Sequence, residues 1–186
     1  MLEQPTLLLL PWIHALDVTR SSVHQGPRWV RSIVAPATNH PLGFAAWGAG
    51  TFAGWLAWLG RKTIQVFESE DESLLLTLYR FWGLSRTWEV LDAEERRVGR
   101  VIGDVICDGL GARLATMGVS TDGSESVLRG EEGTVLASWQ GLPGQGCYFR
   151  FGEAAADNPF LRMTALAGVL ALPPWPGDLS LAAKPA

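Results

Sequence analysis

The sequence predicts a mainly β (α+β) fold, a closed antiparallel β-barrel of about 10 to 12 strands around one buried apolar C-terminal helix at about residues 159–172. Short runs of β-branched and aromatic residues alternate with turn formers along most of the chain. One segment near the C-terminus is apolar on nearly every helical face, so it must be enclosed by protein. With 186 residues, 47% of them hydrophobic, the chain is long enough for one domain with a substantial core and short for two.

Eleven short runs are predicted as strands, and Gly, Pro, Asn, Asp and Glu clusters separate most of them. The runs are residues 6–10, 29–34, 42–47, 63–67, 74–79, 87–91, 98–106, 112–119, 126–129, 134–140 and 147–151. The last run alternates, with Cys147, Phe149 and Phe151 on one face and Tyr148 and Arg150 on the other. Such alternation places one face in a core and the other in water.

The helix has clear boundaries. Asp157 or Asn158 can accept a backbone N–H as the N-cap, Pro159 suits the first helical position, and Pro173 stops the helix. The apolar stretch is shorter than the roughly 20 residues that a bilayer span needs. Arg162 is the only charged residue inside it.

Arg162 lies near the N-terminal end of the predicted helix. Its long side chain is expected to keep its charge in water or to pair with Asp157 or Glu153. The functional alternative is a charged lining at one mouth of the barrel.

One barrel domain is expected over residues 1–172, followed by a loose tail over residues 173–186 that is rich in Pro, Gly and Ala. The net charge of −4 argues against a nucleic-acid binder. Cys107 and Cys147 are expected to be buried free thiols in a reducing compartment. The N-terminal apolar run stops at Pro11 and no basic residues precede it, so the protein is not expected to be secreted.

The sequence shows no signature of catalysis. His14, His24 and His40 have no second metal ligand three or four residues away, so no metal is expected. The glycine-rich stretch at residues 48–54 is one residue too long for a dinucleotide-binding loop and lacks a βαβ unit around it. The carboxylates of residues 68–72 fall in a polar turn. We therefore expect a protein that is not an enzyme and uses no cofactor.

Residues 42–59 carry no charge and are rich in tryptophan and glycine, and three interpretations remain open. The segment is a transmembrane helix, a strand followed by core-filling aromatic residues, or an exposed apolar loop that dips into a membrane interface. In the last case lipid would be bound by the tryptophans together with the two basic residues that follow, which would sit beside lipid phosphates. These candidate lipid-binding residues are Trp47, Trp55, Trp58, Arg61 and Lys62.

The order of elements resembles the tubby C-terminal fold, which phospholipid scramblases and plant LURP-one-related proteins share. Residues 66–79 (VFESEDESLLLTLY) are similar to a family hairpin. Residues 87–102 (TWEVLDAEERRVGRVI) are similar to the family's unit of strand, acidic turn and V-G-x-I. Residues 157–160 (DNPF) and 163–172 (MTALAGVLAL) are similar to the helix that fills the barrel. The resemblance covers residues 28–172.

The sequence also departs from this family. It lacks the Cys-rich stretch and the Pro-rich N-terminal arm of scramblases, and their acidic loop shrinks to Glu153, Asp157 and Asn158. Calcium dependence and lipid scrambling are therefore not implied. No Lys or Arg aligns with the basic residues through which tubby proteins bind phosphoinositides.

The resemblance and the tryptophan-rich segment imply a non-enzymatic barrel that binds phospholipid or sits at a membrane surface. Its expected place is the cytoplasm, peripheral at the inner membrane face. The alternative is a soluble protein-interaction or scaffold module with the same fold and no lipid affinity. A third hypothesis is an enzyme whose site is assembled from distant residues. An exposed position of Trp47, Trp55 and Trp58 would favour lipid binding, and a buried one the interaction module.

Overall fold

The computed structural model describes residues 1–15, 28–49, 62–80, 87–121, 123, 125–142 and 146–172. Two short 3-10 segments, Glu131–Gly133 and Glu153–Ala155, and the helix α1 (Pro159–Leu170) accompany the strands in this part of the chain. The strands are β1 (Thr6–Leu9), β2 (Ile13–Ala15), β3 (Arg28–Val34), β4 (Pro41–Ala49), β5 (Lys62–Glu68), β6 (Leu74–Arg80), β7 (Thr87–Asp92), β8 (Arg97–Ile102), β9 (Val105–Asp108), β10 (Arg113–Val119), β11 (Ser126–Arg129), β12 (Val135–Leu142) and β13 (Gly146–Phe151).

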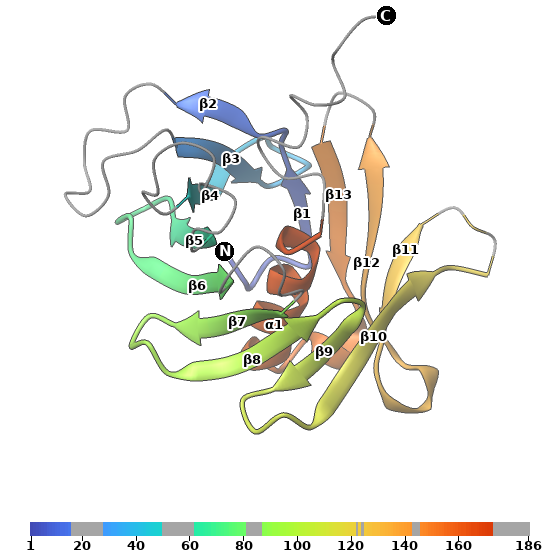
Figure 1. Ribbon diagram of the computed structural model, residues 1–186. Helices are drawn as coiled ribbons and strands as arrows, with labels where there is room; N and C mark the ends of the chain where they lie inside the picture. Colours follow the sequence, from blue (N-terminus) through green and yellow to red (C-terminus); the bar gives the residue numbers. More distant parts are fainter. Residues whose placement is uncertain are drawn as a thin grey trace, which may run out of the picture.

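The strands form a closed antiparallel barrel (Figure 1). Each strand from β3 to β13 pairs with the next one along the chain. The first strand closes the ring, because β1 pairs with β13 on one edge and with β3 on the other. Strand β2 continues along β3 beyond the point where β1 ends, so the barrel itself has twelve strands of the 13-stranded sheet. This closure confirms the predicted fold class.

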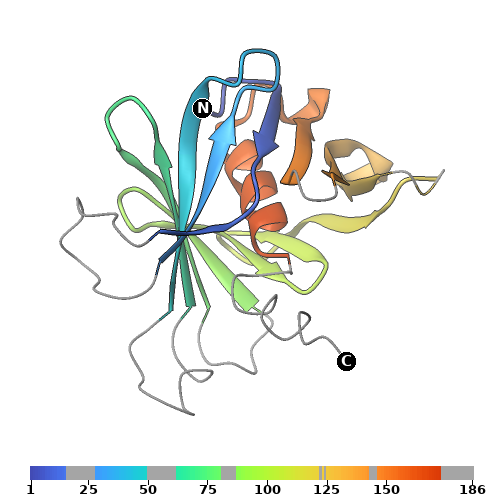
Figure 2. The ribbon, with the colours of Figure 1, turned by 90° about the horizontal axis from the view of Figure 1, so that it is seen from above.

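The helix α1 runs through the interior of the barrel, as Figure 2 shows from a second direction. Its N-cap is Asn158, whose side-chain oxygen accepts a hydrogen bond from the N–H of Leu161 at 3.1 Å. Every helix residue from Arg162 to Leu170 is buried. A helix that is apolar on all sides is thereby removed from water on all sides, as its composition requires.

Small residues occupy inward positions on four strands of the barrel wall: Gly43 and Ala45 on β4, Gly99 on β8, Ala115 on β10 and Ala137 on β12. A Cβ atom on Gly99 would lie 2.9 Å from the Cγ2 of Thr164 on α1. A larger side chain at Gly99 would therefore collide with the helix, because protein interiors have little free volume. The helix thus occupies the space that large side chains of the strands fill in a barrel without a central helix.

Several sequence expectations need correction. The run at residues 98–106 is two strands rather than one, because Gly103 (φ +62°) and Asp104 turn the chain between β8 and β9. Strand β2 was not expected. Residues 42–49 belong to β4, so the transmembrane-helix interpretation of residues 42–59 is wrong for its first part, and residues 50–59 lie outside the described residues. No helix among the described residues is long and apolar enough to cross a membrane.

The expectation that Arg162 keeps its charge in water is also wrong. Arg162 is only 9% exposed, and its hydrogen bonds go to the carbonyl oxygens of Ala155 and Leu2 rather than to a carboxylate. Its guanidinium also lies 5.0 Å from the ring centroid of Phe151. This side chain therefore joins the start of α1 to the N-terminal segment and to the segment before the helix.

Both cysteines are buried and free, as the sequence predicts. Burial raises the pKa of the Cys147 thiol, although the nearby charge of Arg31 opposes the shift. A thiol of this kind stays protonated and makes a poor nucleophile. The predicted tail, residues 173–186, lies outside the described residues.

Candidate functional site

The two ends of the barrel differ in the side chains that they carry. At one end β4 and β6 finish and β5 and β7 begin, and there the described inward-facing residues of these strands include Trp47, Lys62, Arg80 and Trp88. We call this the tryptophan end. At the other end three hairpin turns carry exposed carboxylates, and we call it the acidic end. Those carboxylates belong to Glu70, Asp71, Glu72, Glu94, Glu95, Glu131 and Glu132.

Tryptophan rings contact one another at the tryptophan end. The Trp47 ring lies edge-on to that of Trp12 at 6.3 Å and to that of Trp88 at 5.9 Å between ring centroids. Trp29 on β3 is the cross-strand partner of Trp47. Trp47 and Trp88 are 4% and 2% exposed, so the inner part of this cluster is core.

Basic side chains cover the faces of these rings. The Nζ atom of Lys62 lies 5.6 Å from the ring centroid of Trp47, and the guanidinium carbon of Arg80 lies 6.0 Å from that of Trp88. Lys62 and Arg80 are direct cross-strand partners on β5 and β6. Cations over indole faces are attracted by the ring quadrupole, so the rings fix the positions of both charges.

A third cation, Arg31 on β3, lies over Trp12 at 5.7 Å. Its Nε donates a hydrogen bond to the carbonyl oxygen of Leu10 at 2.6 Å, where the chain leaves β1. Burial lowers the pKa of the Arg31 guanidinium, and the nearby Cys147 opposes the shift. Arg31 is therefore held by the wall. Lys62 at the start of β5 is half-buried, and Arg80 at the end of β6 is 9% exposed.

The structure describes only two of the five candidate lipid-binding residues, Trp47 and Lys62. Trp47 is buried, so its ring holds Lys62 in place instead of presenting a free surface. Lys62 lies at the tryptophan end, half-buried. Trp55, Trp58 and Arg61 lie outside the described residues. Sequence reasoning missed Arg80 and Trp88, although a strand ending in Arg80 opposite a strand beginning near Trp88 would have pointed to them.

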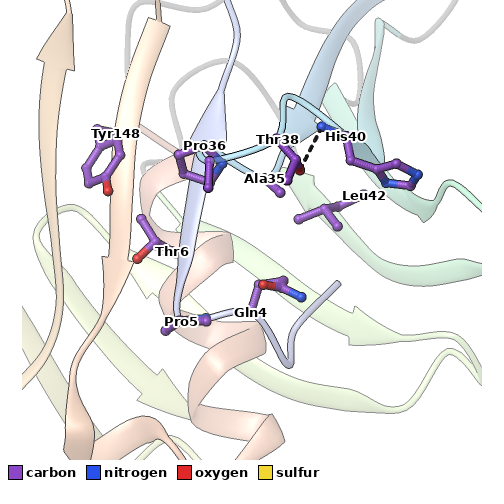
Figure 3. A pocket seen from close by; sticks show the side chains of 10 residues that line it. Gln4, Pro5, Thr6, Ala35, Pro36, Thr38, His40, Leu42 and Tyr148 are labelled. Carbon is purple, nitrogen blue, oxygen red and sulfur yellow. Dashed lines mark hydrogen bonds between the residues drawn. The ribbon is translucent and has the colours of Figure 1, made fainter.

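An open pocket lies on the outer wall near the acidic end, where β1 meets the turn between β3 and β4 (Figure 3). It has a volume of about 680 Å³ and is lined by residues 4–6 and 35–38 together with His40, Leu42 and Tyr148. We call it the seam pocket, because β1 closes the barrel here. A second open pocket of about 570 Å³ lies between β12 and β13, with Arg150 and Glu153 in its lining.

The described residues hold no group of three or more His, Cys, Asp or Glu side chains that could bind a metal ion. The seam pocket contains His40 and Tyr148 as titratable residues, and Figure 3 shows their side chains on opposite sides of it.

No protein-family model and no curated protein matches the sequence. Among solved structures the chain is similar to the X-ray structure of a protein from Arabidopsis thaliana, AT5G01750, with a TM-score of 0.50. The sequences are 13% identical, and the match covers 90% of this chain and 89% of that chain. At this identity the likeness shows a shared fold and nothing about activity.

Proposed function

We propose that this chain is a non-enzymatic barrel of the tubby-like and scramblase-like family, which binds membrane surfaces containing anionic phospholipid. The tryptophan end faces the lipid. The observation that carries the proposal is the inward cross-strand pair of cations, Lys62 and Arg80, held over Trp47 and Trp88 at one end of the barrel. The shared fold with a plant protein is consistent with the resemblance in the sequence.

The distribution of charge supports this orientation. The net charge of −4 would by itself oppose binding to an anionic surface. The exposed carboxylates of three hairpin turns lie at the acidic end, away from Lys62 and Arg80. At the tryptophan end Asp104 lies on the turn between β8 and β9, and Glu125 directly precedes β11. An anionic surface would therefore attract one part of the rim and repel the opposite end.

A specific observation favours the alternative of an interaction module without lipid affinity. Trp47 is 4% exposed, and buried tryptophans leave no apolar patch for a bilayer. In the proposal the ring of Trp47 therefore does not contact lipid itself, and its role is to hold the cation of Lys62 in place. The direct apolar contacts are assigned to Trp55 and Trp58, with Arg61 beside them.

Flotation of the purified protein with liposomes tests the proposal. Vesicles of phosphatidylcholine alone are compared with vesicles that also contain phosphatidylserine. The variants are Lys62→Glu and the double variant Trp55→Ala/Trp58→Ala, and the matched control is Arg97→Glu. Arg97 is exposed at the start of β8, at the acidic end. Its charge reversal changes the net charge by as much as Lys62→Glu does, but at the end of the barrel that does not face lipid in the proposal.

We expect the wild type and Arg97→Glu to float with the anionic vesicles, and the other two variants to float less. Absence of flotation with either vesicle, from a folded protein, would refute lipid binding and leave the interaction module. Equal losses from Lys62→Glu and Arg97→Glu would show that only net charge matters and would refute the assignment to the tryptophan end.

A further inference from the structure

The seam of the barrel leaves part of a strand edge unpaired. In β1 the odd-numbered residues point their main-chain groups toward β13, since the N–H of Phe151 donates to the carbonyl oxygen of Pro5 at 2.9 Å. The even-numbered residues point toward β3, since the N–H of Leu10 donates to the carbonyl oxygen of Ser32 at 2.9 Å. The N–H and C=O of Thr6 therefore point away from β13, into the seam pocket.

Strand β3 ends before it reaches Thr6. Pairing of β1 with β3 is limited to Leu8 with Val34 and Leu9 with Ile33. Beyond Val34 the chain turns, because the N–H of Ala35 donates to the carbonyl oxygen of His40. Continuing the register would place Pro36 opposite Thr6, and proline has no N–H to donate. Among the described residues no main-chain hydrogen bond joins Thr6 to this turn.

This combination is an open strand edge at the bottom of a pocket. An unpaired edge is a template for another extended chain, and adding a strand to such an edge is a common mode of peptide recognition. Figure 3 shows Thr6 between Tyr148 on one side and Pro36 and Thr38 on the other. Tyr148 is 40% exposed, so its ring is available to a side chain of the bound segment.

The charges around the pocket indicate what kind of segment fits. The N–H of Ser69 donates to the carbonyl oxygen of the lining residue Leu42 at 3.0 Å, which places the acidic turn at residues 70–72 beside the pocket. Glu3 is exposed next to the lining residue Gln4. The nearest base is Arg150, the cross-strand partner of Thr6 on β13, and its guanidinium lies 3.7 Å from a carboxylate oxygen of Glu125. The surroundings are therefore predominantly negative.

We propose that the seam pocket binds a short, extended, basic peptide segment of a partner protein, which pairs with the main chain of Thr6 as an added strand. Its basic side chains face the carboxylates of Glu3 and residues 70–72. This site is separate from the tryptophan end, so it does not depend on the lipid proposal. It would let one barrel bind a membrane at one end and a protein near the other.

The probe is fluorescein-labelled acetyl-Lys-Val-Lys-Val-Lys-Val-amide, with binding measured by fluorescence anisotropy at low salt. Two comparison peptides have the same length: one with Glu in place of Lys, and one with every main-chain nitrogen methylated. The protein variants are Thr6→Pro, which removes the N–H that points into the pocket, and Thr6→Val as the matched control. Because that N–H does not bond to β13, Thr6→Pro is expected to keep the fold.

We expect the Lys peptide to bind the wild type and Thr6→Val equally. Methylation of the peptide or the Thr6→Pro change should weaken binding at least about tenfold, the effect of losing one or two hydrogen bonds. The Glu peptide should bind more weakly than the Lys peptide. Flotation with anionic vesicles should be the same for Thr6→Pro and the wild type.

The proposal is overturned if the Lys peptide does not bind, if the methylated peptide binds as well, or if folded Thr6→Pro binds as well as the wild type. If Thr6→Pro fails to fold, the comparison of the two peptides on the wild type decides. A loss of flotation in folded Thr6→Pro would mean that the seam pocket serves lipid instead of peptide.

Discussion

Lys62 and Arg80 lie directly opposite each other on β5 and β6, and both side chains point into the barrel at its tryptophan end. Like charges at directly opposed positions of a sheet repel each other. The faces of Trp47 and Trp88 offset part of this cost by attracting the two cations. The pair concentrates positive charge at one rim of an otherwise acidic protein, where an anionic group would be held most strongly.

The first prediction concerns this pair. Lys62→Ala should weaken binding to phosphatidylserine-containing vesicles about fivefold, because one cation near such a surface contributes about 1 kcal/mol. Arg80→Ala should weaken it less, because Arg80 is only 9% exposed. Binding to phosphatidylcholine vesicles should not change. Vesicle sedimentation at constant salt measures both, with Arg97→Ala at the acidic end as the control. A loss of the same size in Arg97→Ala would contradict the local role of the pair.

The second prediction tests the contact between the barrel wall and the helix. In Gly99→Ala the new Cβ atom would meet the carbonyl oxygen of Cys107 and the Cγ2 atom of Thr164, each at 2.9 Å. Overpacking of this kind costs about 1–3 kcal/mol. Gly118→Ala on β10 is the control, because a Cβ atom there meets nothing within 4 Å. Urea denaturation should show a lower free energy of unfolding for Gly99→Ala only, and equal values would place the helix elsewhere.

The same packing explains which parts of the fold the sequence could predict. The alternation in β13 could be recognised in the sequence because Phe149 and Phe151 face the core while Tyr148 and Arg150 face water. In the first half of β4 the pattern is reversed. The small residues Gly43 and Ala45 face inward, whereas Phe44 lies on the outer face and stacks on Phe67 at 5.0 Å. The inward face of a barrel that encloses a helix therefore cannot be recognised by side-chain size alone.

The site was harder to predict than the fold. The turn at Gly103 and Asp104 was hidden because Val101 and Ile106 on the flanking strands are both apolar and buried, so the run looked continuous. Arg80 was not identified because a charge at a strand end usually faces water, and only the pairing of β5 with β6 turns it inward beside Lys62. Pairing between strands follows from the closed barrel and is not encoded in any one segment.

The third prediction is a pH dependence. Burial alone would raise the pKa of Asp92, but hydrogen bonds from the main-chain N–H groups of Arg96 and Glu94 and from the Arg96 guanidinium outweigh it and lower the pKa. A lowered pKa in the folded state means that the ionised carboxylate adds stability above its unfolded pKa of about 3.9. That stability is lost as the pH falls through the folded value.

Asp92→Asn should therefore be less stable than the wild type at pH 7, and the difference should shrink as the pH falls below about 4. Thermal unfolding between pH 7 and pH 3 measures this difference in melting temperature. A difference that stays constant over this range would contradict the role of the ionised carboxylate.

The fourth prediction concerns Arg162. Arg162→Met keeps much of the side-chain volume but leaves the carbonyl oxygens of Ala155 and Leu2 without their donor. Loss of hydrogen bonds to buried groups costs about 1–3 kcal/mol, and the free energy of unfolding in urea should fall by that amount. The control is Arg150→Met, whose exposed side chain pairs weakly with Glu125 at 3.7 Å and should change stability little. Equal effects from both would show that Arg162 does not join the helix to the N-terminal segment.

The last prediction tests whether α1 is the core of the barrel. Leu166 is 0% exposed, whereas Phe160 in the first turn of the same helix is 57% exposed. Leu166→Lys would place an unpaired charge among apolar side chains of the surrounding strands, and that cost exceeds the whole stability of most domains of this size. We expect no cooperative thermal unfolding from Leu166→Lys, a loss of about 2–5 kcal/mol from Leu166→Ala, and little change from Phe160→Lys. If Leu166→Lys melted at the wild-type temperature, the helix would not fill the barrel, and other side chains would have to form the core beneath the cation pair at the tryptophan end.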